Sequence, residues 1–358
     1  DMDDQLGPVR VKASEWGSGA GQAAVTSVMT GWDHTCAALS GGSLWCWGHG
    51  ANGRLGTWDT SDQLTPMRVK ASEWGSGAGQ VKVASVSAGA GAAHSCCILT
   101  DGSLWCWGLG ASGQLGTGGT GDQLTPMRVN AAEWGSGPSE VPAVHVSSMA
   151  AGRHHTCCIR SDGSLWCWGS ANALGIGSTG NRLTPQRVNA ASWGSDQGQM
   201  PVTVLAACGF NTCAVVSDGS LWCWGWGYYG QLGLGDTKDR LTPTRVMASQ
   251  WGSGAGQIRV LSVSVAGHHV CAILSDNALW CWGEGVAGQL GLGHTASRNT
   301  PQRVMPDSWG TDGTREPVVA IDTAGSHTCA VLLSGSLWCW GAGANGRLGT
   351  GDTDNELT

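Results

Sequence analysis

One six-residue string, Ser-Leu-Trp-Cys-Trp-Gly or a variant that begins with Ala, occurs six times along the 358 residues of this sequence. Its central cysteines lie 56 to 61 residues apart, as in the step of 60 residues from Cys46 to Cys106. A period of this kind indicates one supersecondary unit used repeatedly, so the fold must stack six equivalent copies. The six strings are Ser43–Gly48, Ser103–Gly108, Ser164–Gly169, Ser220–Gly225, Ala278–Gly283 and Ser336–Gly341.

Each period contains four short apolar or alternating runs that are separated by glycine-rich segments. In one copy the runs are Val81–Ser87, His94–Leu99, Ser103–Gly108 and Pro126–Val129. Such runs are typical of β-strands joined by turns, and no segment has a convincing helical period. Four antiparallel strands make one complete propeller blade. The sequence therefore predicts an all-β fold, a six-bladed β-propeller of four-stranded antiparallel blades.

The two tryptophans of each string predict how the blades pack. In a strand, Leu104 and Cys106 point to one face while Trp105 and Trp107 point to the other. A single blade cannot bury both faces by itself, and each indole can remove roughly 150–250 Å² from water. We expect the tryptophans to be wedges between neighbouring blades.

The two ends of the sequence are adjoining parts of one repeat. Residues 4–11 match the segment that contains the fourth run, and Asp352–Thr358 matches the segment just before it. We therefore expect residues 1–358 to form a single propeller in which residues from about 1 to 11 supply the outer strand of the last blade. That exchange would remove an open sheet edge. A segment cut from a longer repeat array would begin and end in the same loop.

Every repeat also has a cysteine ten residues before the central one. Between them, turns such as Thr100-Asp101-Gly102 predict a three-residue hairpin loop with glycine in the left-handed position. That loop places Cys96 directly opposite Cys106 at a non-hydrogen-bonded position, within reach of a disulfide. The alternative is six pairs of buried, reduced cysteines. The predicted disulfides are Cys36–Cys46, Cys96–Cys106, Cys157–Cys167, Cys213–Cys223, Cys271–Cys281 and Cys329–Cys339.

Three cysteines remain outside this pattern, namely Cys97, Cys158 and Cys208. Cys97 and Cys158 follow a pairing cysteine and so face the other side of the strand, where we expect small buried apolar residues. Six disulfides indicate an oxidising compartment, and therefore a secreted or cell-surface protein.

A histidine precedes the first cysteine of five repeats by two residues, and Asn211 takes this place in the fourth. Two hypotheses fit a residue that recurs in nearly every blade. The side chains could converge to ligate a metal or an anion, or each could hold its own strand turn by hydrogen bonding. The second needs no ligand, and we expect no metal and no cofactor. The histidines are His34, His94, His155, His269 and His327.

Aromatic residues outside the repeated strings are the best candidates for a binding site. One group consists of a tryptophan in each insert between blades, and six such residues on one face would suit a sugar or a protein partner. Alternatively, each tryptophan folds back over the end of its blade. The other group, Trp226, Tyr228 and Tyr229, interrupts the repeat pattern and is expected on the opposite face. The insert tryptophans are Trp16, Trp74, Trp134, Trp193, Trp251 and Trp309.

The repeat resembles a known family. Ala324–Leu332 reads Ala-Gly-Ser-His-Thr-Cys-Ala-Val-Leu, and similar strings are followed by Gly-Ser-Leu-Trp-Cys-Trp-Gly, Gly-Gln-Leu-Gly and Thr-Pro-x-Arg-Val. These motifs are similar to the regulator of chromosome condensation repeat family, and they cover essentially the whole chain. The resemblance implies a β-propeller, usually of seven blades, whereas this sequence has six repeats. It is nearer to secreted, cysteine-bearing members than to the nuclear nucleotide exchange factor. Fold alone does not transfer an activity.

Charge and composition exclude several kinds of partner. Charged residues make up 13% of the sequence, and the net charge is −7. Nucleic-acid binding needs a basic face, so we expect no nucleic-acid partner. No apolar run approaches the roughly 18 residues that a membrane-spanning helix needs, so we expect no membrane span.

No catalytic constellation stands out. The sequence has no Ser-His-Asp order, no carboxylate pair confined to one blade and no phosphate loop. We therefore predict a non-enzymatic extracellular recognition or scaffold module whose partner is a protein, a glycan or copies of itself. Two alternatives stay open, a self-assembling structural subunit of an extracellular fibre or coat and a nucleotide exchange factor with reduced cysteines.

Overall fold

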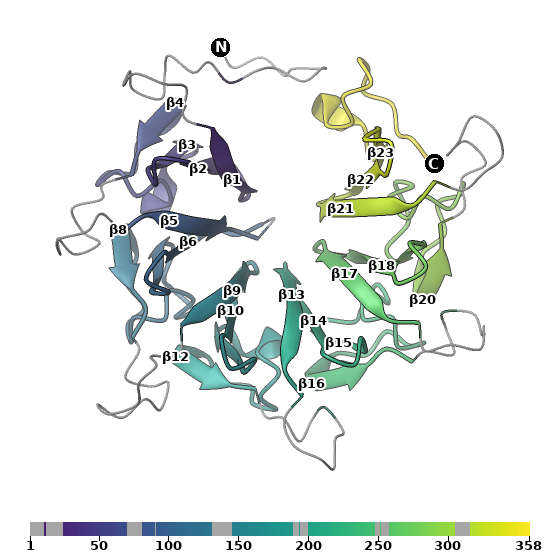
Figure 1. Ribbon diagram of the computed structural model, residues 1–358, viewed down its shortest axis with the longest axis horizontal. Coiled ribbons are helices and arrows are strands. Elements are labelled where there is room, and N and C mark those ends of the chain that lie inside the picture. The colour runs from purple at the N-terminus through teal and green to yellow at the C-terminus, as the bar shows by residue number, and fades with distance from the viewer. Residues whose placement is uncertain are drawn as a thin grey trace. The chain divides into compact units, whose positions relative to one another are not determined.

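The computed structural model describes residues 11, 24–69, 81–89, 91–130, 145–188, 193, 200–247, 251, 258–304 and 316–358. The chain divides into two compact units, each with three blades (Figure 1). The N-terminal unit comprises Val11–Asn189 with Cys208–Phe210, and the C-terminal unit comprises Ala190–Ala207 with Asn211–Thr358.

The N-terminal unit contains three four-stranded antiparallel sheets, each with its strands in chain order. Blade 1 consists of β1 (Val25–Thr30), β2 (His34–Leu39), β3 (Leu44–Gly48) and β4 (Gln63–Arg68). Blade 2 consists of β5 (Val83–Ser87), β6 (His94–Leu99), β7 (Leu104–Gly108) and β8 (Gln123–Arg128). Blade 3 consists of β9 (Val146–Ala151), β10 (His155–Arg160), β11 (Leu165–Gly169) and β12 (Arg182–Arg187).

The C-terminal unit repeats this pattern. Blade 4 consists of β13 (Val202–Cys208), β14 (Asn211–Val216), β15 (Leu221–Gly225) and β16 (Arg240–Arg245). Blade 5 consists of β17 (Val260–Val265), β18 (His269–Leu274), β19 (Leu279–Gly283) and β20 (Arg298–Arg303). Blade 6 has three described strands, β21 (Val318–Ala324), β22 (His327–Leu332) and β23 (Leu337–Gly341). The predicted fold class, an all-β six-bladed propeller, is confirmed.

The predicted closure of blade 6 stays a prediction, because residues 1–10 lie outside the described residues. The described part of this blade has one further pairing, an antiparallel bridge between Gly341 and Glu356. No helix in the described ranges is long and apolar enough to cross a membrane.

The hairpin between the second and third strands has the predicted register. In blade 2, Leu99 N–H donates to Ser103 O at 3.0 Å, and Gly102 adopts φ +77°. This turn places Cys96 opposite Cys106. All six predicted disulfides are present in the structure, with Cα–Cα distances of 4.1–4.2 Å. The hairpins are therefore cross-linked in every blade.

The contact of Trp107 with blade 1 confirms the predicted packing of a repeated tryptophan between neighbouring blades. Trp107 of blade 2 is fully buried and donates its Nε1–H to the carbonyl of Arg54 in blade 1 at 3.0 Å. It packs in one apolar cluster with Leu44 and Leu55 of blade 1 and with Leu99 of blade 2. The indole thus buries its ring and satisfies its single donor at the same contact.

The fourth strand differs from its predicted bounds. We expected it to begin at Pro126, but β8 begins at Gln123. A register shift lies between Cys106 and Gly108, and Gly108 faces Gln123 across it. Proline has no N–H to donate and is tolerated at position 126 because β8 is the outer strand of its sheet.

Candidate functional site

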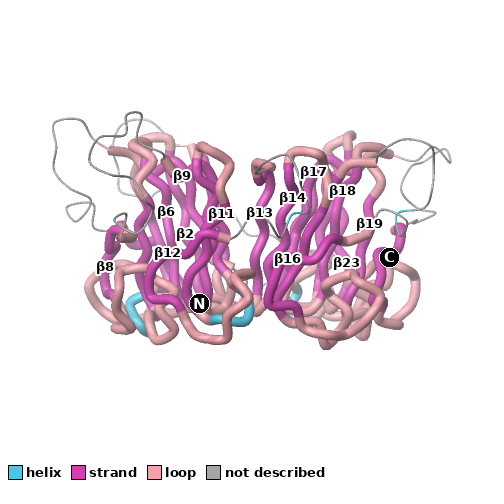
Figure 2. The backbone as a smooth tube through the Cα atoms, turned by 90° about the horizontal axis from the view of Figure 1, so that it is seen from below, coloured by secondary structure: helices cyan, strands magenta, loops and turns pink. Residues whose placement is uncertain are grey.

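The connections of a blade fall at two ends because its strands alternate in direction. The connections between the first and second strands and between the third and fourth strands lie at one end, which we call the loop end. The disulfide-linked hairpins lie at the other end. Figure 2 shows the short 3-10 turns, such as Ala51–Gly53 and Ala171–Ala173, at the loop end of the strands. Loops on a rigid sheet are common positions for binding residues.

The repeated histidines lie just inside the loop end, where three of them, His34, His94 and His269, bond to the next blade. His94 Nε2 lies 2.9 Å from Thr156 Oγ1, and Thr156 donates to the carbonyl of Gln114 at 2.8 Å. Trp168 donates its Nε1–H to the same carbonyl at 2.9 Å. One carbonyl therefore receives both the hydroxyl and the indole of blade 3.

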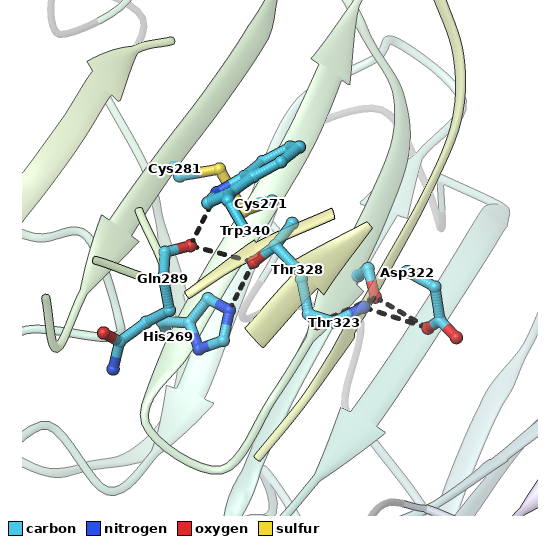
Figure 3. Close-up of a disulfide and its surroundings, with 9 residues drawn as sticks. His269, Cys271, Cys281, Gln289, Asp322, Thr323, Thr328 and Trp340 are labelled. Carbon is cyan, nitrogen blue, oxygen red and sulfur yellow. Dashed lines mark hydrogen bonds between the residues drawn. A yellow bond between two sulfur atoms is a disulfide. The ribbon is translucent and has the colours of Figure 1, made fainter. Parts of the chain in front are cut away.

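This arrangement recurs in both units. Figure 3 shows it in the C-terminal unit, where His269 Nε2 lies 2.8 Å from Thr328 Oγ1 while Thr328 and Trp340 both donate to Gln289 O. The sequence-based hypothesis that each histidine holds its own strand turn was therefore wrong for these residues. A neighbouring hydroxyl supplies the partner that a buried ring nitrogen needs.

Burial controls the protonation of these histidines. It lowers the pKa to about 3 for His34, His94, His155 and His269, since a buried imidazolium loses its hydration. In the described structure, His34, His94 and His269 join neighbouring blades. Among the described residues, no group of three or more His, Cys, Asp or Glu side chains is placed to hold a metal ion.

Two of the six insert tryptophans are described, and both are covered. Trp193 is 3% exposed and packs edge-on against Trp222, with ring centroids 5.4 Å apart. Trp251 is 5% exposed and packs against Trp280 at 5.6 Å in the same way. These two side chains fold back over their blades, so we do not include them in the candidate site. The other four, Trp16, Trp74, Trp134 and Trp309, lie outside the described residues.

The second aromatic group is exposed at the loop end of blade 4, in the connection between β15 and β16. Tyr228 is 73% exposed and Trp226 is 37% exposed. The Tyr228 and Tyr229 rings meet edge-on, with centroids 5.0 Å apart. Blade 5 contributes His268, whose ring lies 4.4 Å from that of Tyr229. We call Trp226, Tyr228, Tyr229 and His268 the tyrosine patch.

The connection that carries the patch is held by its own side chains. Asp239 Oδ1 accepts the N–H of Gly227 at 2.8 Å, and Gln231 Oε1 accepts the N–H of Tyr229 at 2.8 Å. Gly230 adopts φ +77°, and an added Cβ would lie 2.6 Å from Asn299. These bonds fix the backbone beneath the two tyrosines, so less conformational freedom is lost when a partner binds.

A carboxylate adjoins the patch beneath His268. Glu284 Oε2 lies 3.2 Å from His268 Nδ1, and the carboxylate side chain is only 13% exposed. Gln289 Nε2 donates to the same oxygen at 3.4 Å. The histidine ring is thus held between Tyr229 and Glu284, which orients it at the surface.

Trp226, Tyr228 and Tyr229 were predicted from the sequence as candidate site residues, whereas His268 and Glu284 were not. A signal for His268 was present, because it stands next to the repeated His269 and makes a His-His pair. Nothing in a single sequence places the blade 5 residues Glu284 and His268 beside Tyr229 of blade 4. That juxtaposition requires the order and spacing of neighbouring blades.

Comparison with known proteins agrees with this architecture. The RCC1-like domain family matches residues 86–358, and the regulator of chromosome condensation (RCC1) repeat matches residues 41–98. The chain is 32% identical over 358 residues to the ultraviolet-B receptor UVR8 of Arabidopsis thaliana, and the match covers 99% of this chain and 72% of the receptor.

Other relatives are larger or more distant. The human E3 ubiquitin-protein ligase HERC2 is 29% identical over 90% of this chain, which spans only 6% of the ligase. The mitochondrial RCC1 domain-containing protein RUG3 of Arabidopsis thaliana is 27% identical over 86% of this chain and 63% of its own length.

Solved structures share the fold at low sequence identity. Human WBSCR16 has a TM-score of 0.77 at 20% identity, over 99% of this chain and 83% of its own. Yeast RCC1 (Prp20), solved bound to Kap60, has a TM-score of 0.72 at 19% identity over 92% of this chain and 73% of its own. The family matches and the similarity to the receptor show that the chain belongs to the regulator of chromosome condensation (RCC1) repeat family.

Proposed function

We propose that the chain is a non-enzymatic recognition module that binds a protein partner through the tyrosine patch. The observation that carries this proposal is the exposure of Tyr228, at 73%, on a fixed connection. Blades 1, 2 and 6 place alanines at the corresponding position, namely Ala51, Ala111 and Ala344. A large exposed aromatic side chain costs solubility and is not required by the repeat, which supports a role in binding.

The chemistry of the patch suits a protein surface. Tyrosine and tryptophan are enriched among the residues that contribute most to protein–protein binding, because they bury much area with few rotatable bonds. The half-exposed His268 and the nearly buried Glu284 add polar groups at the margin of the rings. This combination of an aromatic centre and a polar rim resembles the composition of protein interfaces.

The cysteines support a secreted or cell-surface location as part of the proposal. Each described blade carries a disulfide, and such bonds persist in oxidising compartments. Cys97 and Cys158 are fully buried, and burial raises the pKa of both thiols. They are therefore protected from thiol–disulfide exchange, which requires an accessible thiolate.

The test compares three immobilised forms of the full-length protein with proteins of its native source. They are the unchanged protein, a patch variant with Trp226→Ala and Tyr228→Ala, and a control variant with Leu124→Ala and Met127→Ala. The control removes two exposed apolar side chains, at 39% and 40%, from the outer strand β8. We expect a protein that the unchanged form and the control retain equally, and that the patch variant retains at least tenfold less.

Equal retention by all three forms would refute the patch as the binding site. Two further measurements separate the other partner classes with the same variants. Binding to a glycan array that is lost only in the patch variant would indicate that the partner is a sugar and not a protein. Self-association in sedimentation that is lost only in the patch variant would indicate that the partner is a second copy of the same protein.

A further inference from the structure

A second group of residues that interrupts the repeat lies at the loop end of the N-terminal unit. It is built from connections between first and second strands, and it brings together Trp32 of blade 1, Arg153 and His154 of blade 3 and Phe210. The Arg153 guanidinium carbon lies 4.8 Å from the centroid of the Trp32 ring and 5.8 Å from that of Phe210. Residues far apart in the sequence therefore converge on one cation.

The backbone fixes this arrangement. Arg153 N–H donates to Gly209 O at 2.8 Å, and Trp32 N–H donates to Ala92 O at 3.2 Å. The first bond ties Arg153 to the connection that carries Phe210, and the second ties Trp32 to the loop of blade 2. Trp32 is nevertheless 54% exposed, and its ring remains accessible to a partner.

The guanidinium of Arg153 is oriented but not neutralised. Its contacts are the two ring faces, which attract a cation without accepting its N–H groups in the plane. No ion pair or side-chain hydrogen bond of Arg153 occurs within the part of the chain that the structure describes. Guanidinium N–H groups in a fixed fork match the two oxygens of a carboxylate.

The neighbouring His154 bears on the charge of the anion that this site can bind. Burial and the adjacent Arg153 lower the pKa of the neighbouring His154, which disfavours a second cation beside the guanidinium. Its Nδ1 is buried without a hydrogen-bond partner among the described residues. Phosphate dianions are usually bound by clusters of arginines, so a single guanidinium suits a singly charged group.

We propose that Arg153, flanked by Trp32 and Phe210, is a binding site for a carboxylate of a protein partner. The guanidinium pairs with the carboxylate, and the exposed Trp32 ring packs against the residue that carries it. This site is separate from the tyrosine patch in its residues, and it does not depend on the function proposed for that patch. The carboxylate comes from an acidic side chain or from the C-terminus of the partner.

The test measures the binding of fluorescein-labelled peptides to the full-length protein by fluorescence anisotropy. An amidated hexaglutamate probes acidic side chains, a neutral Gly-Ser hexapeptide with a free C-terminus probes the terminal carboxylate, and amidated hexaglutamine is the neutral control. We expect at least one carboxylate probe to bind and the neutral control not to bind. Arg153→Gln should weaken that binding at least tenfold, because the ion pair is lost.

Two variants make the result specific. Arg153→Lys keeps the charge and removes the planar fork, so it should weaken binding about threefold to tenfold. Arg68→Gln makes the same charge change on the exposed end of β4 and should alter binding less than about twofold, since a distant exposed charge acts only through a screened field. The intermediate Arg153→Lys result keeps the test valid if Arg153→Gln fails to fold.

Three results would overturn the proposal. The first is binding of neither carboxylate probe to the unchanged protein. The second is carboxylate binding that is the same in the Arg153 and Arg68 variants, which would indicate attraction to the surface as a whole. The third is a phosphoserine peptide that binds more than tenfold tighter than its glutamate counterpart, which would assign the site to a dianion.

Discussion

The buried histidines predict that the propeller loses stability in mild acid. Folding places His34, His94, His155 and His269 in positions where burial lowers the pKa from 6.5 to about 3. Between these two values the unfolded protein binds a proton at each site and the folded protein does not. Stability therefore falls as the pH falls from about 6.5 toward 3, and it is fully retained above 6.5.

The magnitude follows from the two pKa values. At pH 5 an unfolded histidine is almost entirely protonated and a folded one almost entirely neutral, which costs about 2 kcal/mol per residue relative to pH 8. Four such residues give a loss of about 8 kcal/mol, which is comparable with the whole stability of a typical domain. The result hardly depends on the folded value, because any folded pKa below about 4 leaves the ring neutral at pH 5.

The assay is urea unfolding followed by tryptophan fluorescence at several pH values between 8 and 5, with the disulfides intact. His94→Asn places in blade 2 the residue type that blade 4 has at Asn211, and it removes one titrating site. We expect its loss between pH 8 and pH 5 to be smaller by about 2 kcal/mol, from linkage at one site.

The matched control is His145→Asn, which makes the same substitution at an exposed position. It should leave the acid-dependent loss unchanged. Stability that stays constant between pH 8 and pH 5 in the unchanged protein, or an equal loss in the His94→Asn and unchanged proteins, would show that neutral buried histidines do not govern the acid response.

Four further measurements test the packing between blades, the backbone strain at Trp58 and the disulfides. Thr156→Val removes the hydroxyl that His94 contacts and should cost about 1–3 kcal/mol in urea unfolding, as a buried polar atom is left without its partner. Gly116→Ala and Gly118→Ala both add a Cβ at positive φ, but only the first meets an indole nitrogen, at 2.6 Å, so it should cost about 1–3 kcal/mol more. Trp58→Gly should stabilise by about 1 kcal/mol, because this tryptophan has φ +81°. Reduction of the denatured protein should add 12 hydrogens by mass, two for each of six disulfides, and alkylation without reductant should label three cysteines only after denaturation.

Much of the fold could be predicted from the sequence because the same turn and strand patterns recur in each blade. The Thr100-Asp101-Gly102 turn sets the hairpin register, and the register decides that Cys96 faces Cys106. Prediction was weaker at the outer strand, where β8 begins three residues before Pro126. A register shift next to Gly108 lengthens this strand, and such irregularities leave little trace in the apolar pattern.

The candidate site was only partly predictable, for a different reason. Tyr228 and Trp226 were visible as departures from the repeat, but the fate of the insert tryptophans depended on packing. Trp193 lies against Trp222, which is distant in sequence, and no local pattern distinguishes that contact from exposure. The histidines were misjudged likewise, since the partner of His94 is Thr156 of the next blade. Interactions between blades need three-dimensional positions.

Trp58 shows how a comparison of the six copies can identify candidate binding residues. The other five copies have glycine at its position, always with positive φ, and the backbone of Trp58 keeps that conformation and 51% exposure. Its N–H still donates to Leu124 O at 3.2 Å, so the connection is intact. A bulky residue in this conformation costs free energy that glycine would not, and such strain persists where another role compensates for it.

Like Tyr228 and Trp32, this residue lies at the loop end, where the packing between blades places few demands on side chains. Comparison among the six copies therefore distinguishes the recurring residues that stabilise the propeller from the exposed residues that depart from the repeat. The equivalent glycines are Gly118, Gly177, Gly235, Gly293 and Gly351.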